Sequence, residues 1–226
     1  MREKKVVAVI VEGPSDEAAL GPSIRDFFMS DEVRFIVVHG DITTNGTLTH
    51  ETIIAKISDL IHTIKIRYRY KNSDFLRIIQ ICDTDGAFAS DSIMEADVGS
   101  VRYYTDHVEV RDADALRDRN ERKAAVLFKL RTSGRINGIP YKIFYNSCNL
   151  EHVLYGKLRH INSREKVRLA DDFAEKYDGN LEAFIQFISS PEVAVPGTYR
   201  DTWEFIEEEN NSLNRHTNIH LIFTDK

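Results

Sequence analysis

Two carboxylates follow an apolar run in the stretch IIQICDTDGAF, residues 78–88, where Asp83 and Asp85 stand two positions apart. This spacing predicts that both side chains point to one side of an extended segment. Carboxylates so close together repel one another unless a cation lies between them. A hard cation such as Mg²⁺ or Mn²⁺ takes oxygen ligands. The pair therefore indicates a metal site, whereas a lone acid here would indicate a turn.

A second acidic group follows an earlier apolar run. KVVAVIV, residues 5–11, leads directly into EGPSDE, which contains Glu12 and Asp16. In parallel α/β sheets, functional residues gather at the carboxyl ends of the strands. If the two strands are neighbours, these acids converge with the later pair. We expect one metal site containing the following acids: Glu12, Asp16, Asp83 and Asp85.

The elements that must position these acids follow from hydrophobic periodicity. Apolar, β-branched runs predict strands over 5–11, 34–40, 75–82 and 141–146. Helical spacing predicts helices over 12–28, 50–64 and 119–134. Ser15 is the expected cap of the first helix, and Gly13 and Gly86 are expected to let the backbone turn sharply beside the site. The alternation predicts an α/β fold with a mainly parallel sheet flanked by helices.

The rest of the chain divides into an insertion and a helical extension. Residues 87–120 are acidic and irregular, so we expect an excursion at the sheet edge. Helical patterns follow over 149–158, 163–177, 180–189 and 202–213. The segment IHLIF, 219–223, predicts an edge strand or a docking segment. We expect a catalytic domain over 1–146 and a helical extension over 147–226 that packs on the same domain.

Composition limits the function classes. The 226 residues are 42% hydrophobic and carry a net charge of −6. This balance argues against binding nucleic acid through overall positive charge, but it leaves room for a local basic patch or a metal-dependent site. Cys82 and Cys148 lack the spacing of a zinc finger. The N-terminal apolar run is too short for a membrane span, so a cytoplasmic protein without membrane attachment is expected.

The order of the two acidic strand ends resembles the Toprim domain, which topoisomerases of types IA and II, bacterial primases, recombination mediators, small ribonucleases and OLD-family nucleases share. Glu12–Gly13 matches its first motif and Asp83–Thr84–Asp85 its second. The resemblance covers residues 5–146. It implies a Toprim-like (Rossmann-like) fold in which Asp83 and Asp85 hold Mg²⁺ (or Mn²⁺), Asp16 serves as a second-site ligand, and Glu12 acts as general acid or base and contacts metal. It also implies a small nuclease that cleaves DNA or RNA.

A further stretch, FYNSCNLEHVLYG, resembles a strand-end signature of RloB-type proteins found near bacterial phage-defence loci. Cys148 and Glu151 fit that signature, while Ser147 replaces its usual proline. The likeness implies that Glu151 is another catalytic acid. The alternative, that Asn149 caps a helix with Glu151 in its first turn, stays open. The basic runs at 67–71 and 119–123 are candidates for gripping phosphate, although solvated faces are the default interpretation.

Two other functions remain open. A haloacid-dehalogenase-type phosphatase also carries Asp-x-Asp-Gly after a strand, and Asp83 would then be its nucleophile. That motif normally follows the first strand, however, and it leaves Glu12 unexplained. The other alternative is a non-catalytic Toprim-like module that partners an ATPase. The sequence predicts no oligomeric state.

Overall fold

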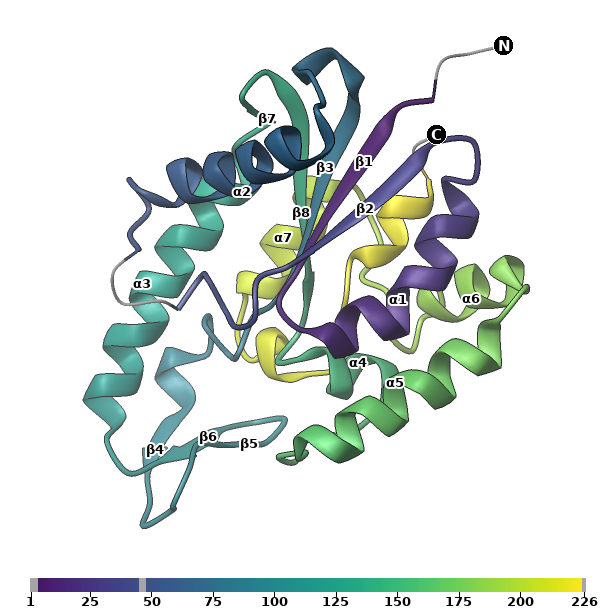
Figure 1. Ribbon diagram of the computed structural model, residues 1–226. Coiled ribbons are helices and arrows are strands. Elements are labelled where there is room, and N and C mark those ends of the chain that lie inside the picture. Colours follow the sequence, from purple (N-terminus) through teal and green to yellow (C-terminus); the bar gives the residue numbers. More distant parts are fainter. Residues whose placement is uncertain (1–3, 45–47, 225–226) are drawn as a thin grey trace.

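The computed structural model describes residues 4–44 and 48–224, which form an α/β fold around a mixed, mainly parallel sheet (Figure 1). Its strand order is β2 (Glu32–Val37), β1 (Val6–Val11), β3 (Phe75–Asp83), β8 (Ile139–Asn146) and β7 (Arg135–Ile136). The first four strands run parallel, and β7 pairs antiparallel with β8. The predicted fold class is confirmed.

Strand β1 shows why helices cover both faces of the sheet. All six of its residues are buried and apolar, which is typical of a parallel strand between two helical layers. Val7, Val9 and Val11 pack with α1 (Pro14–Phe27), α5 (Ser163–Tyr177) and α6 (Leu181–Ile188). The intervening residues, Val6, Ala8 and Ile10, pack with α2 (Ile53–Tyr68) and α3 (Ala113–Arg131). Side chains therefore alternate between an α1 face and an α3 face, and Figure 1 shows these two layers.

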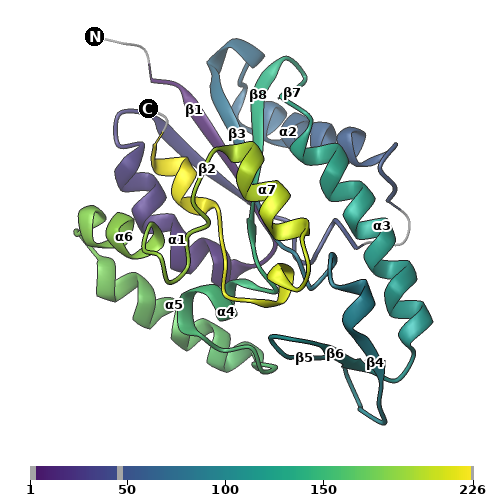
Figure 2. The same ribbon diagram turned by 180° about the vertical axis from the view of Figure 1, so that it is seen from behind.

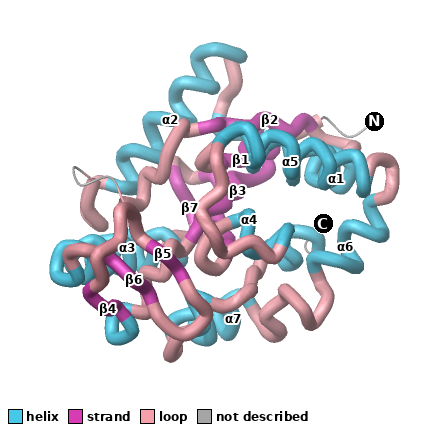
Figure 3. Tube along the Cα trace, turned by 90° about the horizontal axis from the view of Figure 1, so that it is seen from below, coloured by secondary structure: helices cyan, strands magenta, loops and turns pink. Residues whose placement is uncertain are grey.

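The segment expected as an insertion, 87–120, has more regular structure than its sequence suggests. It holds a short 3₁₀ turn, Ser90–Ser92, and a small sheet of β4 (Ile93–Glu95), β6 (Val108–Val110) and β5 (Arg102–Tyr103) (Figure 3). Helix α3 starts at Ala113, six positions before the expected start at 119, because Asp112 caps it by accepting a hydrogen bond of 2.9 Å from Ala115 N.

The C-terminal part completes both layers. It contains α4 (Leu150–Tyr155), α5, α6, α7 (Tyr199–Glu207) and the 3₁₀ turns η3 (Asn211–Leu213) and η4 (Ile219–Phe223). IHLIF is thus a short helix that docks, and an edge strand is wrong for it. Phe223 stacks edge-on against Phe27 and Phe184, and Figure 2 shows this yellow segment beside α1. Because its apolar residues join the α1-face core, the segment gains more from burial than from edge pairing.

The first helix begins differently from the expectation. Gly13 is the N-cap and Pro14 the first helical residue, so Ser15 as the cap is wrong. Pro is favoured at this first position because its missing N–H is one that the helix would leave unpaired. The chain bends at Gly13 as expected, but its extended backbone is one that any residue adopts, so this bend does not require glycine. Its amide donates to Asp16 Oδ2 over 2.9 Å and holds that acid at the helix start.

Among the described residues, no helix has the length and apolar character that crossing a bilayer requires.

Candidate functional site

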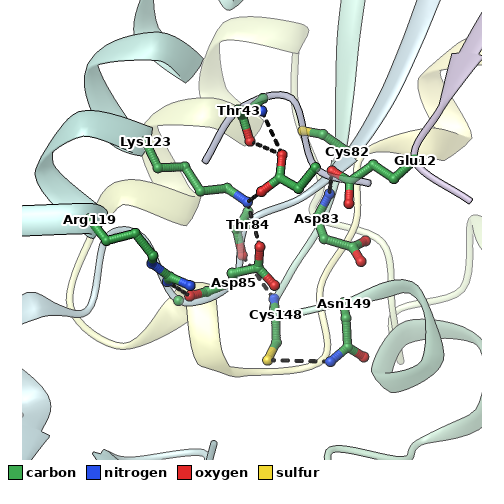
Figure 4. Close-up of polar contacts among 12 residues, drawn as sticks. Glu12, Thr43, Cys82, Asp83, Thr84, Asp85, Arg119, Lys123, Cys148 and Asn149 are labelled. Atoms are coloured by element: carbon green, nitrogen blue, oxygen red, sulfur yellow. Dashed lines mark hydrogen bonds and ion pairs between the residues drawn. The ribbon is translucent and has the colours of Figure 1, made fainter. Parts of the chain in front are cut away.

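The carboxyl ends of β1 and β3 lie side by side. The two strands pair in parallel, with Ile10 opposite Gln80. Directly beyond this pairing, Asp83 N donates a hydrogen bond of 3.1 Å to Glu12 Oε1 (Figure 4). The convergence of Glu12 and Asp83 that the sequence predicts is therefore present. It depends on β3 lying next to β1, which sequence order alone does not require.

One group of acids gathers on the α1 face. Asp83 follows Ile79 and Ile81 in the strand alternation, and these pack in the α1-face core. Asp16 stands in the first turn of α1 and Glu151 in the first turn of α4. A cavity of about 590 Å³ is lined by all three acids together with Glu12. The chain thus brings four of its five predicted acids to one hollow.

Burial and mutual repulsion shape the charge of this hollow. Burial raises the pKa of Asp83 well above its usual value, and the nearby acids, Glu12 first and Asp16 next, add to the increase. Burial likewise raises the pKa of Asp16, although the hydrogen bond from Gly13 opposes it. Negative charge here is therefore costly, and a bound cation would relieve it.

A buried lysine organises the α3 face. Lys123 Nζ lies 2.6 Å from Asp41 Oδ2 and 2.5 Å from Asp85 Oδ2, and its side chain is fully buried (Figure 4). Burial alone would lower the pKa of Lys123, but Asp85, Asp41 and Glu12 outweigh it and raise the pKa. Lys123 is therefore a fixed positive charge beside the site.

Lys123 favours the ionised form of both Asp41 and Glu12, but the net pKa shifts of the two acids differ in direction. Burial alone would raise the pKa of Asp41, but Lys123 and the hydrogen bonds from Thr43 lower it to about 2. Burial raises the pKa of Glu12 well above its usual value, Asp41 adds to the increase, and Lys123 only partly offsets it. Asp41 is thus held ionised, while Glu12 is poised to hold or release a proton.

Asp85 joins the lysine because the backbone changes direction after β3. Its φ is 48° and that of Gly86 is 65°, both in the left-handed region. The predicted same-side arrangement of Asp83 and Asp85 is therefore wrong, since alternation holds only within an extended strand. The predicted sharp turn at Gly86 is confirmed. An added Cβ there would lie 2.9 Å from Leu213 Cδ2.

The helix-cap interpretation of the second signature is confirmed, and the catalytic role of Glu151 stays a prediction. Asn149 caps α4 by accepting a hydrogen bond of 2.8 Å from His152 N. Glu151 sits in the first turn, is only 5% exposed, and pairs with Lys166 over 2.7 Å. Since its carboxylate also lines the acidic cavity, a capping role for Asn149 does not remove Glu151 from the site.

Sequence reasoning missed Asp41 and Lys123. Asp41 follows the second strand, so the rule that selected Glu12 and Asp83 would also have selected it. Lys123 lies in the basic run 119–123, for which a solvated face is the default interpretation; for this residue that default is wrong. The positions 116, 120, 123 and 127 are all buried, and this helical spacing was the available signal.

The acids on the α1 face fit a small divalent cation by their donor chemistry. Within residues 4–44 and 48–224, no three acidic, histidine or cysteine side chains converge tightly enough to form a complete ligand set. Mg²⁺ does not require one, because it is usually held by one or two carboxylates together with waters and substrate phosphates. Asp83 and Asp16 offer such a pair, with Glu12 and Glu151 beside it.

Comparisons with known proteins identified no relative of this chain. No protein-family model matches the chain, and no curated protein and no solved structure matches it either.

Proposed function

We propose that this protein is a Toprim-type nuclease that cleaves phosphodiester bonds of nucleic acid with the help of Mg²⁺ or Mn²⁺. The observation that carries the proposal is the meeting of Glu12 and Asp83 at the ends of adjacent parallel strands, with Asp16 and Glu151 in the same cavity. The order of the motifs along the chain supports the Toprim assignment. A place in phage defence rests on the RloB-like stretch around Glu151.

In this proposal Asp83 and Asp16 hold the ion, with Glu12 in contact. A divalent ion in such a site polarises a phosphoryl oxygen and lowers the pKa of a bound water. The chain's own residues supply the rest. Glu12 is placed to move a proton, because it lines the cavity beside Asp83 and Asp16. Its Oε1 is oriented by the Asp83 amide, so the acceptor stays in one position.

Lys123 and Asp85 act as a positioning pair in the same proposal. The Lys123 ammonium joins the loop after β2, through Asp41, to the turn after β3, through Asp85. Both segments border the site. The Lys123 ammonium also places a positive charge near Glu12 that does not depend on metal concentration. Lys123 already offsets part of the carboxylate charge on the α3 face, and the cavity lined by Asp16 and Asp83 lies on the α1 face, so we assign the divalent ion to the α1 face.

The proposal is tested by incubating the protein with single-stranded DNA, duplex DNA, RNA and a small phosphomonoester, with Mg²⁺, Mn²⁺ or EDTA. We expect metal-dependent strand cleavage that Asp83→Ala abolishes. Asp91→Ala is the matched control, because Asp91 is an exposed acid eight positions away and should leave cleavage unchanged. Cleavage that persists in Asp83→Ala would rule out the assigned site.

Two other results would favour the alternatives. Release of phosphate from the monoester without cleavage of any polynucleotide would favour the phosphatase. Binding of Mn²⁺, seen by calorimetry, without any turnover would favour a Toprim-like module that acts through a partner such as an ATPase.

A further inference from the structure

A second cavity adjoins the acidic one. It has a volume of about 500 Å³ and lies between the β5 arm of the small sheet and the segment 158–161 that precedes α5. Figures 1 and 2 both show the tip of this arm facing the start of α5. Glu151 and Lys166 line both cavities, so the two lie next to each other. We call this second cavity the hairpin groove.

The hairpin groove is basic although the chain is acidic. Its lining includes Arg102, Arg159 and Lys166 against a single acid, Glu151. Arg102 and Arg159 have side chains that are each 60% exposed. Arg102 lies 3.9 Å from Glu109, and Arg159 pairs with Glu165 over 2.5 Å. Exposed ion pairs of this kind are weak, so a phosphate group can replace the carboxylates.

An aromatic platform stands at the rim. The turn of the β5–β6 hairpin is closed by Tyr104 N donating to His107 O over 2.9 Å. The two rings stack with centroids 4.3 Å apart and an angle of 7° between their planes. Tyr104 lines the groove and is 37% exposed. Flat aromatic rings beside a basic track are the features that bind unpaired bases and their phosphates.

The hairpin is anchored to the acidic site. Strand alternation turns Tyr103 inward, where an added Cβ on Gly86 would lie 3.3 Å from its ring. Asn210 and Asn214 donate hydrogen bonds to Asp106 O and Thr105 O and hold the outer turn. The platform is therefore fixed relative to the turn that follows β3.

We infer that the hairpin groove binds single-stranded nucleic acid and leads it past Glu151 and Lys166 to the acidic cavity. The inference rests on the proposed function and adds its substrate class. A groove of about 500 Å³ is the size of a small-ligand pocket and takes individual nucleotides. A duplex keeps its bases stacked inside and offers none to Tyr104. Single strands are thus the form that uses both the cations and the platform.

The test measures binding of labelled oligonucleotides of about 12 nucleotides by fluorescence anisotropy in EDTA, where no cleavage occurs. Single-stranded DNA, single-stranded RNA and the matching duplex are compared, so that the two sources of single strands are distinguished. We expect both single strands, or one of them, to bind at least tenfold more tightly than the duplex. Tyr104→Ala should weaken that binding about tenfold, whereas Tyr104→Phe should retain it.

The control for the aromatic platform is Tyr68→Ala, since Tyr68 is also exposed but ends α2 and lies outside the groove. The pair Arg102→Ala and Arg159→Ala should reduce the slope of log affinity against log salt by about 1.4, or about 0.7 for each lost phosphate contact. Arg200→Ala, at a highly exposed arginine on α7, is the matched control.

The possible results distinguish a failure of the single-strand binding proposal from a failure of the nuclease proposal. Equal binding of duplex and single strands, or equal affinities for Tyr104→Ala and Tyr68→Ala, would overturn the groove even if Asp83-dependent cleavage is found. Selective binding lost in Tyr104→Ala, without cleavage under any metal condition, would support the groove while the nuclease proposal fails.

Discussion

The backbone amide of Asp83 donates a hydrogen bond to the Glu12 carboxylate, so residues 71 positions apart in the sequence meet at one edge of the sheet. This contact joins two differently charged surroundings. Asp83 belongs with Asp16 and Glu151 on the α1 face, while Glu12 lies near Asp41, Asp85 and Lys123 on the α3 face. Glu12 therefore links the positive charge of Lys123 to the α1 face, where we propose that the metal ion binds.

The first prediction concerns stability without metal. Asp83→Asn should stabilise the metal-free protein at neutral pH by roughly 1 kcal/mol, or about 2–4 °C in Tm for a chain of this size, while cleavage is lost. Because burial raises the pKa of Asp83, the folded protein holds a proton that the unfolded chain releases above about pH 4. The carboxyl's contribution to stability is thus complete below that pH and declines as pH rises.

The gain from Asp83→Asn is consequently expected to disappear in acid and to be largest at neutral or higher pH. Thermal unfolding in EDTA, followed by the fluorescence of Trp203, which is buried and the only tryptophan of the chain, measures it. Asp91→Asn serves as the exposed control. A destabilised Asp83→Asn at neutral pH would contradict the repulsion described for this site.

The second prediction concerns the buried lysine. Lys123→Met should destabilise the protein by about 3–5 kcal/mol, because it leaves Asp41 and Asp85 without their shared cation. Lys129→Met, at an exposed position of the same helix, should change the free energy of unfolding by less than about 0.5 kcal/mol. Urea denaturation gives both values.

Adding Asp41→Asn to Lys123→Met should recover part of the loss of stability, since one unpaired charge is then removed.

The ion pair between Lys123 and Asp41 also predicts a loss of stability at low pH. The pKa of Asp41 is lowered to about 2, so its stabilising contribution is present above about pH 4 and is lost as pH falls toward 2. The single Asp41→Asn variant should lack this part of the acid unfolding curve.

The third prediction links metal binding to protons. Burial raises the pKa values of Glu12, Asp83 and Asp16, so part of this group is protonated in the metal-free protein. A divalent ion must displace those protons. Mn²⁺ affinity should therefore increase with pH, and calorimetry in buffers of different ionisation enthalpy should detect proton release. Affinity that is independent of pH, or unchanged in Asp83→Asn, would contradict this assignment.

The fourth prediction tests the turn after β3. Gly86→Ala should cost about 1–3 kcal/mol, because Gly86 has a φ of 65° and its new Cβ would approach buried Leu213. Gly134→Ala is the matched control, since it lacks a left-handed φ and its Cβ would meet no atom within 4 Å. Equal denaturation midpoints for the two variants would show that the turn is not strained by a side chain.

The sequence predicted the sheet and most of the acids because both depend on local pattern. Continuous apolar runs identified the strands, and acids directly after them identified Glu12 and Asp83. The neighbouring position of β1 and β3, on which their meeting depends, was only a condition in that argument. Asp41 was accessible to the same rule, because it directly follows the predicted strand 34–40.

The remaining features depend on contacts that no local pattern encodes. Lys123 is buried only because two carboxylates from other segments surround it, and a buried lysine is rare enough that the default interpretation is a solvated one. Asp85 turns away from Asp83 because the backbone becomes left-handed after the strand. The hairpin that carries Tyr104 has strands of two and three residues, too short for alternation to be visible.

The turn that carries Asp83 and Asp85 is fastened by residues made much later in synthesis. Thr84 Oγ1 and Cys148 N both donate hydrogen bonds to Ser212 O, which lies 128 positions after Thr84. At ribosomal rates of about 5–20 residues per second, roughly 6–25 s pass between the two segments. The acidic centre therefore reaches its final geometry only when nearly all of the described chain has been translated, so a partly made chain does not yet hold an assembled site.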